Sequence, residues 1–153
     1  MQSLIKTKKD LKKYFSKYKY FEKIKFKLEK EKNKLEDKYT TLRATNFDEK
    51  IFSNFNNSKE KQLYKYLELL EKQDNKLLII KLEQDKIKDL INYVDDIQRE
   101  VLIDIYINFF SYSEISKKYN FCERYIYKLE DKALLDILDY LKVKKSDEIL
   151  TIF

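Results

Sequence analysis

The chain of 153 residues contains no glycine, no proline and no histidine, and its only cysteine is Cys122. Without glycine it cannot carry a Walker-type phosphate loop or a glycine-rich dinucleotide fingerprint. The glycine turns that join β-strands are missing as well, which argues against a compact β-sandwich. Lysine, leucine, glutamate and isoleucine dominate instead and favour long helices. We therefore expect an all-α fold.

The missing histidines also narrow the possible functions. Histidine is the usual general base near neutral pH and the commonest metal ligand. One thiol can form neither an internal disulfide nor a cysteine zinc site. No pair of carboxylates stands out as an acid and a base, so a hydrolase that uses carboxylates alone is the least favoured interpretation. We expect a protein that is not an enzyme and that uses no cofactor and no metal.

Long apolar runs are absent too. None approaches the roughly eighteen residues that a membrane span needs. The segment 1–6 has no apolar stretch of signal-peptide length. These features predict a cytoplasmic protein without a membrane partner.

The net charge of +6 is spread unevenly along the chain. Residues 1–39 carry 14 basic and 6 acidic side chains, whereas residues 95–153 carry 9 basic and 12 acidic ones. Part of the lysine excess is what an AT-rich genome tends to encode. The positive charge that could attract a nucleic acid is therefore concentrated near the N-terminus.

Residues 1–94 are predicted to form an antiparallel coiled-coil helical hairpin. Helices are expected over 3–39 and 58–93, separated by a polar loop at 40–58 that is rich in asparagine, serine and threonine. Ser58 is the expected N-cap of the second helix. Apolar residues in both helices are spaced alternately by three and four, the pattern of a coiled-coil seam. The seam residues are Leu4, Leu11, Tyr14, Tyr18, Phe21, Leu28, Leu35 and Tyr39 in the first helix, and Leu63, Tyr66, Leu70, Leu77, Ile80, Ile87, Ile91 and Val94 in the second, with Gln73 and Gln84 as polar members.

Residues 95–143 are predicted to form a unit of three helices. The first begins near Asp95 and Asp96, whose charges suit a helix N-terminus. Ser111 and Glu114 have the spacing of a capping box, which begins a short second helix. Asn120 tolerates the left-handed conformation that a turn requires, and a third helix follows over 123–142. Its predicted buried stripe is Ile126, Leu129, Ala133, Ile137 and Tyr140, and the apolar tail 144–153 is expected to dock on the body of the protein or on a partner.

A short helix, a three-residue turn and a longer helix are typical of a helix-turn-helix, although a three-helix bundle without a nucleic-acid role has the same pattern. Residues 110–134 are more specific, because they resemble, without a gap, region 4 of the sigma-70 factors. They are most similar to small phage transcriptional regulators with a region-4-like domain. The resemblance spans residues 11–138 and is specific over 97–134. The matching residues are Ser111, Tyr112, Glu114, Ile115, Phe121, Arg124, Ile126, Tyr127, Lys128, Leu129, Lys132, Ala133 and Leu134.

Three residues depart from the family pattern. Asn120 stands in place of the turn glycine, and Cys122 replaces the serine that usually caps the recognition helix, so this cap is weaker. Ser116 replaces an alanine at the contact between the two helices but is still small. A net charge of −3 over residues 95–153 also argues against strong phosphate binding, unless a local positive face or the basic N-terminal helix contributes.

The resemblance implies a DNA-binding transcriptional regulator of phage or prophage type, which docks the helix 123–142 in the major groove. Double-stranded DNA is then the partner, and RNA polymerase and a second copy of the chain are further expected partners. Each candidate residue is also compatible with ordinary solvated surface. The residues expected to contact DNA are Arg124, Tyr127, Lys128, Lys117, Lys118, Ser113 and Glu123.

The alternative interpretation is a phage-encoded inhibitor or interaction module. It would bind a protein through the coiled-coil hairpin and would not bind DNA. The acidic C-terminal part and the basic N-terminal helix are consistent with it.

Overall fold

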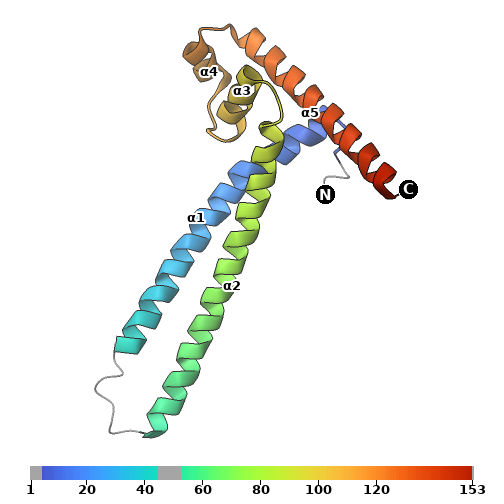
Figure 1. Cartoon of the computed structure of the whole chain (residues 1–153). Helices are drawn as coiled ribbons and strands as arrows, with labels where there is room; N and C mark the ends of the chain where they lie inside the picture. Colours follow the sequence, from blue (N-terminus) through green and yellow to red (C-terminus); the bar gives the residue numbers. More distant parts are fainter. Residues whose placement is uncertain (1–4, 45–52, 153) are drawn as a thin grey trace. The chain divides into compact units, whose positions relative to one another are not determined.

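The computed structural model describes the backbone of residues 5–44 and 53–152, and the side chains of residues 5–44 and 58–145. The described residues form five helices (Figure 1). They contain no β-strand, so the predicted all-α class is confirmed for this part of the chain. The helices are α1 (Lys8–Ala44), α2 (Ser53–Ile91), α3 (Asp96–Tyr106), α4 (Tyr112–Tyr119) and α5 (Glu123–Ile152).

The predicted boundaries of the loop 40–58 were wrong at both ends. Helix α1 continues to Ala44 and α2 already begins at Ser53, so that Ser58 lies inside α2 and is not its N-cap. The rest of the predicted loop, 45–52, lies outside the described residues. Residues 40–44 and 53–58 are helical because adding a residue to an existing long helix is easier than starting a new helix.

The outer ends of the helical regions also differ from the prediction. Helix α1 begins at Lys8, after a local cap in which Thr7 Oγ1 accepts a hydrogen bond from the Asp10 N–H and the Asp10 carboxylate accepts one from the Thr7 N–H, both at 3.2 Å. The Lys6 N–H donates to the same carboxylate, and these bonds lower the pKa of Asp10. At the other end, α5 continues to Ile152, so the predicted tail 144–153 is helical through that residue.

The chain divides into two compact units with boundaries that differ from the predicted ones. We call Glu22–Glu83 the two-helix unit, and Met1–Phe21 together with Gln84–Phe153 the core unit. The N-terminal end of α1 and the C-terminal end of α2 therefore belong with α3, α4 and α5.

In the two-helix unit, α1 and α2 run antiparallel and side by side (Figure 1). The Lys32 ammonium lies 2.7 Å from the Asp74 carboxylate, and Gln73 donates a hydrogen bond of 3.2 Å to Glu31. The Asp74 partner raises the pKa of Lys32, first through the hydrogen bond and then through its charge. Side chains at the predicted seam positions of α2 in this unit are half-buried or buried: Leu63, Tyr66, Leu70, Gln73, Leu77 and Ile80.

The core unit contains two clusters of buried apolar side chains. The larger one joins four helices, since Leu11 and Phe15 of α1 and Ile91 of α2 pack with Leu102 of α3 and Leu134 of α5. The smaller cluster holds α3, α4 and α5 together through Val101, Ile115, Ile126 and Leu129. On α5 the predicted buried stripe is confirmed for Ile126, Leu129, Ala133 and Ile137, while Tyr140 is half-buried.

Candidate nucleic-acid interface

Helix α4 and the turn after it are defined by local hydrogen bonds. Ser111 Oγ accepts a bond of 3.2 Å from the Glu114 N–H, and Glu114 Oε2 accepts one of 3.1 Å from the Ser111 N–H. This is the predicted capping box. At the other end Asn120 has φ 56° and ψ 39°, the left-handed conformation that was expected for it. The start and the end of α4 are therefore confirmed in geometry as well as in position.

Hydrogen bonds between Ser116 and Phe121 stabilise the turn between α4 and α5, which contains no glycine. The Ser116 carbonyl accepts a hydrogen bond of 3.1 Å from the Phe121 N–H, and the Ser116 hydroxyl donates to the Phe121 carbonyl. Ser116 thus ties the short helix to the turn through both its backbone and its side chain. On the far side, the Cys122 carbonyl accepts bonds from the N–H groups of Tyr125 and Ile126, while its thiol is free and exposed.

The N-terminal part of α5 presents two different faces. Ile126 is completely buried, whereas Arg124, Tyr127 and Lys128 are exposed. Positions i, i+3 and i+4 lie on the same side of a helix, so these three exposed residues share one face. The other predicted residues, Ser113, Lys117 and Glu123, are exposed as well.

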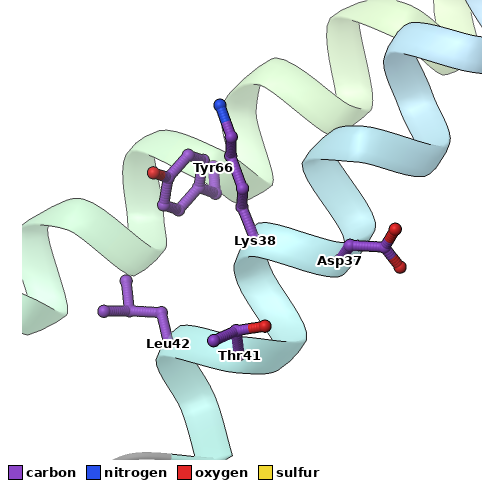
Figure 2. Close-up of a pocket in the computed structure, with 5 residues that line it drawn as sticks. All are labelled: Asp37, Lys38, Thr41, Leu42 and Tyr66. Atoms are coloured by element: carbon purple, nitrogen blue, oxygen red, sulfur yellow. The ribbon is translucent and has the colours of Figure 1, made fainter.

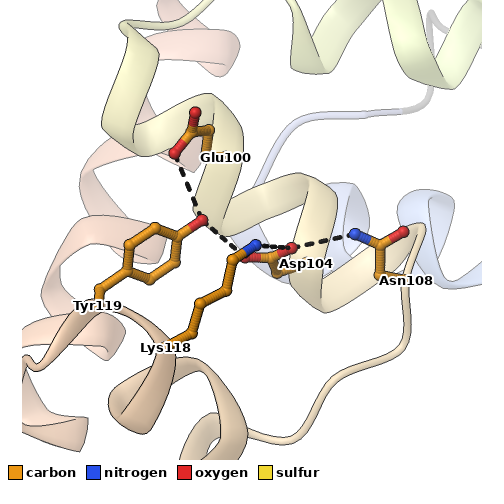
Figure 3. Close-up of polar contacts among 5 residues, drawn as sticks. All are labelled: Glu100, Asp104, Asn108, Lys118 and Tyr119. Atoms are coloured by element: carbon orange, nitrogen blue, oxygen red, sulfur yellow. Dashed lines mark hydrogen bonds and ion pairs between the residues drawn. The ribbon is translucent and has the colours of Figure 1, made fainter.

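Lys118 differs from the other predicted DNA contacts because its charge is paired inside the unit. Its ammonium lies 3.1 and 3.0 Å from the two carboxylate oxygens of Asp104 on α3 (Figure 3). Hydrogen bonds from this group to Asp104 and Tyr119 raise the pKa of Lys118. A phosphate contact by Lys118 would have to compete with this pair.

Asp104 is 2% exposed and has further donors around it. The Tyr119 hydroxyl donates a hydrogen bond of 2.8 Å, and the Asn108 amide donates one of 3.0 Å (Figure 3). Burial, followed by the bond to Asp104, raises the pKa of Tyr119 to about 12. A buried carboxylate needs such donors, since an unpaired charge inside a protein is strongly destabilising. Asp104 thus fixes α4 against α3.

Glu130 is the second buried carboxylate, and it is only 1% exposed. It accepts hydrogen bonds from the hydroxyls of Tyr106 at 3.1 Å and Tyr112 at 2.6 Å, and the Lys12 ammonium lies 3.5 Å away. Burial and the Glu130 charge raise the pKa of both tyrosines. One side chain of α5 thereby connects α1, α3 and α4.

Sequence reasoning missed Asp104 and Glu130, although a signal was present. Asp104 lies beside Ile105 on the apolar face of α3, and Glu130 lies beside Leu129 on the apolar face of α5. A carboxylate on the buried face of an amphipathic helix needs donors from neighbouring elements. That pattern could have indicated buried, paired acids.

The two buried acids also change the charge balance at the surface. Residues 111–134 contain five basic and four acidic side chains, and one of the four acids is the buried Glu130. Another, Glu114, is used in the capping box. Residues 111–134 thus carry more basic than acidic side chains, although Lys118 among the basic ones is already paired with Asp104.

Aromatic rings surround the same region. The Tyr127 ring is stacked on the Tyr112 ring, with centroids 4.1 Å apart and planes inclined by 23°. The Tyr125 ring meets the Phe121 ring edge to face at 4.9 Å. The exposed face of α5 thus combines the cationic groups of Arg124 and Lys128 with the ring of Tyr127.

A hollow of about 440 Å³ in the two-helix unit contains none of the predicted site residues (Figure 2). It is lined by Asp37, Lys38, Thr41, Leu42 and Tyr66.

Within the described ranges, no cluster of three or more histidine, cysteine, aspartate or glutamate side chains has a metal-binding arrangement. None of the helices described in this structure is long and apolar enough to span a membrane.

Comparisons with protein-family models, with curated proteins and with solved structures find no significant match to this chain.

Proposed function

We propose that this protein is a DNA-binding transcriptional regulator of phage or prophage type, which acts in the cytoplasm and docks the N-terminal part of α5 in the major groove. One observation carries the proposal. Arg124, Tyr127 and Lys128 are exposed on one face of α5, while Ile126 and Leu129 bury the opposite face against α3 and α4. An α-helix fits the width of the major groove, and its exposed side chains can then reach the base edges.

Five of the candidate residues have side chains whose chemistry suits a base or a phosphate. The Arg124 guanidinium can donate two hydrogen bonds to a guanine, whereas the Lys128 and Lys117 ammonium groups suit phosphates. The Glu123 carboxylate can accept from a cytosine amino group, and the Ser113 hydroxyl can donate to a phosphate. In helix-turn-helix proteins the helix before the recognition helix crosses the DNA backbone, which is the place of α4 here.

The experiment that tests the proposal is a selection of binding sites from randomised duplex DNA by the full chain. We expect recovery of a common sequence motif. We also expect loss of binding by a folded Arg124→Ala, Lys128→Ala double variant. A variant with Lys81→Ala and Lys72→Ala on the two-helix unit removes two exposed cations elsewhere and is the matched control. Recovery of no motif, or full binding by the Arg124/Lys128 variant, would contradict the proposal.

The same selection bears on two proposed partners. Two half-sites one helical turn apart would support a homodimer, because the symmetry of a dimer is repeated in its site. A single half-site would support a monomer. Contact with RNA polymerase is tested separately, by measuring whether the protein retains the polymerase on a promoter that carries the selected motif.

A second candidate function is an interaction module that binds a protein and not DNA. It is favoured by two groups of exposed apolar side chains on α2, separated by about three helical turns: Tyr64 and Leu67, then Leu78, Ile79 and Leu82. Exposed apolar groups of this kind mark protein–protein contact surfaces. If this candidate is correct, Leu78→Ser with Leu82→Ser abolishes function in cells, whereas the Arg124/Lys128 double variant retains it.

A further inference from the structure

Tyr127 is a partly exposed ring with a fixed neighbour. It is 47% exposed on α5, and the ring of Tyr112 from the start of α4 stacks on it with a centroid separation of 4.1 Å. An exposed tyrosine without such a neighbour can occupy several staggered rotamers. The stacked ring restricts Tyr127 to the orientations that keep the two planes together.

Tyr112 is itself held at both ends. It is the first residue of α4, and the capping box of Ser111 and Glu114 fixes this first turn. Its hydroxyl donates a 2.6 Å hydrogen bond to Glu130. Glu130 is held in turn by the Tyr106 hydroxyl and by the Lys12 ammonium. The ring that supports Tyr127 is thus anchored to the buried Glu130 of α5, and through it to the buried Tyr106 of α3 and the exposed Lys12 of α1.

We propose that Tyr112 and Glu130 are positioning residues, which hold the Tyr127 ring in its binding orientation before DNA arrives. This inference rests on the proposed function, and it adds a reason why Tyr127 can contribute to recognition. Neither Tyr112 nor Glu130 needs to touch the DNA. They act through the stacked ring, which connects the buried network to the exposed face of α5.

The physical benefit is a smaller loss of side-chain freedom on binding. Ordering a free, rotamer-rich side chain at an interface weakens binding, and a side chain ordered beforehand avoids that loss. The cost of ordering one such side chain corresponds to roughly a two- to tenfold change in affinity. We expect loss of the Tyr112 ring to weaken DNA binding by this factor.

Two substitutions at Tyr112 separate its ring from its hydroxyl. Tyr112→Leu removes the stacked ring, whereas Tyr112→Phe keeps the ring and removes only the bond to Glu130. Tyr125→Leu is the matched control, because Tyr125 is an exposed tyrosine on the same helix as Tyr127, and its ring packs on Phe121 and not on Tyr127. All variants are compared at a temperature at which thermal unfolding shows them to be folded.

The first measurement concerns the ring itself and needs no DNA. In spectra of the full chain labelled at its tyrosine rings, the stacked neighbour shifts the Tyr127 ring resonances through its ring current. We expect Tyr112→Leu to abolish this shift, Tyr112→Phe to weaken it and Tyr125→Leu to leave it unchanged. Tyr127 resonances at the position of a free tyrosine in the unsubstituted protein would overturn the proposal.

The second measurement is affinity for the duplex recovered by selection, read as a double-mutant cycle. We expect Tyr112→Leu to weaken binding in the normal background and to have no further effect in a Tyr127→Ala background. Equal losses in both backgrounds would show a merely structural role and would overturn the proposal. If Arg124→Ala weakens binding while Tyr112→Leu does not, the proposed function stands and only the positioning role fails. If no duplex is recovered, the proposed function fails, and the positioning role fails with it even where the ring measurement shows an ordered Tyr127.

Discussion

The ammonium group of Lys12 lies 3.5 Å from the carboxylate of Glu130, which pairs a residue near the start of the chain with a buried charge on α5. The hydroxyls of Tyr106 and Tyr112 complete the set of donors. A buried carboxylate with three donors connects helices that are far apart in the sequence. This contact adds to the packing of Leu11 and Phe15, which holds α1 in the core unit.

The first prediction concerns Glu130. Replacing it with alanine leaves the hydroxyls of the buried Tyr106 and the half-buried Tyr112 without their acceptor. An unsatisfied buried group such as that of Tyr106 costs about 1–3 kcal/mol of unfolding free energy. Glu130→Gln keeps an acceptor oxygen and should cost less. Urea unfolding measures both changes, and Glu123→Ala on the exposed face of the same helix is the control. An unfolding midpoint unchanged by Glu130→Ala would contradict the buried network.

The second prediction is that residues 95–143 do not fold alone. Leu102, Leu134 and Ile137 lose their cover when Leu11 and Phe15 of α1 are absent, because all five belong to one cluster. We expect circular dichroism of the isolated segment to show much less helix than the full chain has there. Within the full chain, Phe15→Ala should lower the unfolding free energy by about 3–5 kcal/mol.

The control for this prediction is Phe26→Ala, which truncates an exposed phenylalanine of the same helix. Exposed substitutions usually change stability by less than about 0.5 kcal/mol. A cooperative thermal transition of the isolated segment at the temperature of the full chain would show that the N-terminal residues are dispensable.

Local features of this fold could be predicted from the sequence, and long-range ones could not. The capping box at Ser111 and the left-handed Asn120 depend on residues at most four positions apart, so their spacing was sufficient. The buried stripe of α5 followed from the helical period. The pairing of Lys12 with Glu130 is different, because nothing in the spacing of two distant residues indicates that they meet.

The candidate site shows the same division. The exposure of Arg124, Tyr127 and Lys128 follows from their positions relative to Ile126 and Leu129 on one helix. Lys118 was expected at the DNA, but its partner Asp104 lies on another helix, 14 residues away. The sequence therefore shows which side chains are exposed. It does not show which of the exposed charges are paired with a residue on another helix.

The third prediction tests the smaller apolar cluster. Ile115→Asp or Leu129→Asp should unfold the core unit, because each places an unpaired charge among Val101 and Ile126. Leu135→Asp is the control, since Leu135 is exposed on α5. Differential scanning fluorimetry should show a large fall in melting temperature for the first two and little change for the third. A melting temperature unaffected by Leu129→Asp would mean that the buried face has been misidentified.

The fourth prediction is a loss of stability at alkaline pH that depends on Tyr119. Its pKa is raised from 10.0 to about 12, so the folded state holds the hydroxyl proton more tightly than the unfolded state does. This contribution is complete below pH 10 and is lost as the pH rises toward 12. The pKa of Lys118 is raised as well, which acts in the same direction.

Urea midpoints measured at pH 9, 10, 11 and 12 should therefore fall with pH. The decline should be shallower in Tyr119→Phe, which has no proton to lose at this position. Tyr64→Phe, in the two-helix unit, removes an exposed hydroxyl and should decline like the unsubstituted chain. Parallel profiles for Tyr119→Phe and the unsubstituted protein would show that Tyr119 does not contribute.

The last prediction separates base recognition from phosphate binding on the exposed face of α5. Arg124 is near the start of the helix, and its fork of donors can make two hydrogen bonds to guanine, worth roughly 1–3 kcal/mol of discrimination. Arg124→Ala should therefore reduce the preference for the selected duplex over a duplex with the recognised guanine replaced. The ammonium of Lys128 is a compact charge that suits a phosphate, so Lys128→Ala should weaken binding to both duplexes alike and lower the salt slope by about one. Fluorescence anisotropy titrations of both duplexes at several salt concentrations distinguish the two effects. If both variants change only the salt slope, the surface binds phosphates and does not recognise bases. That result would contradict the proposal that this protein is a sequence-specific regulator.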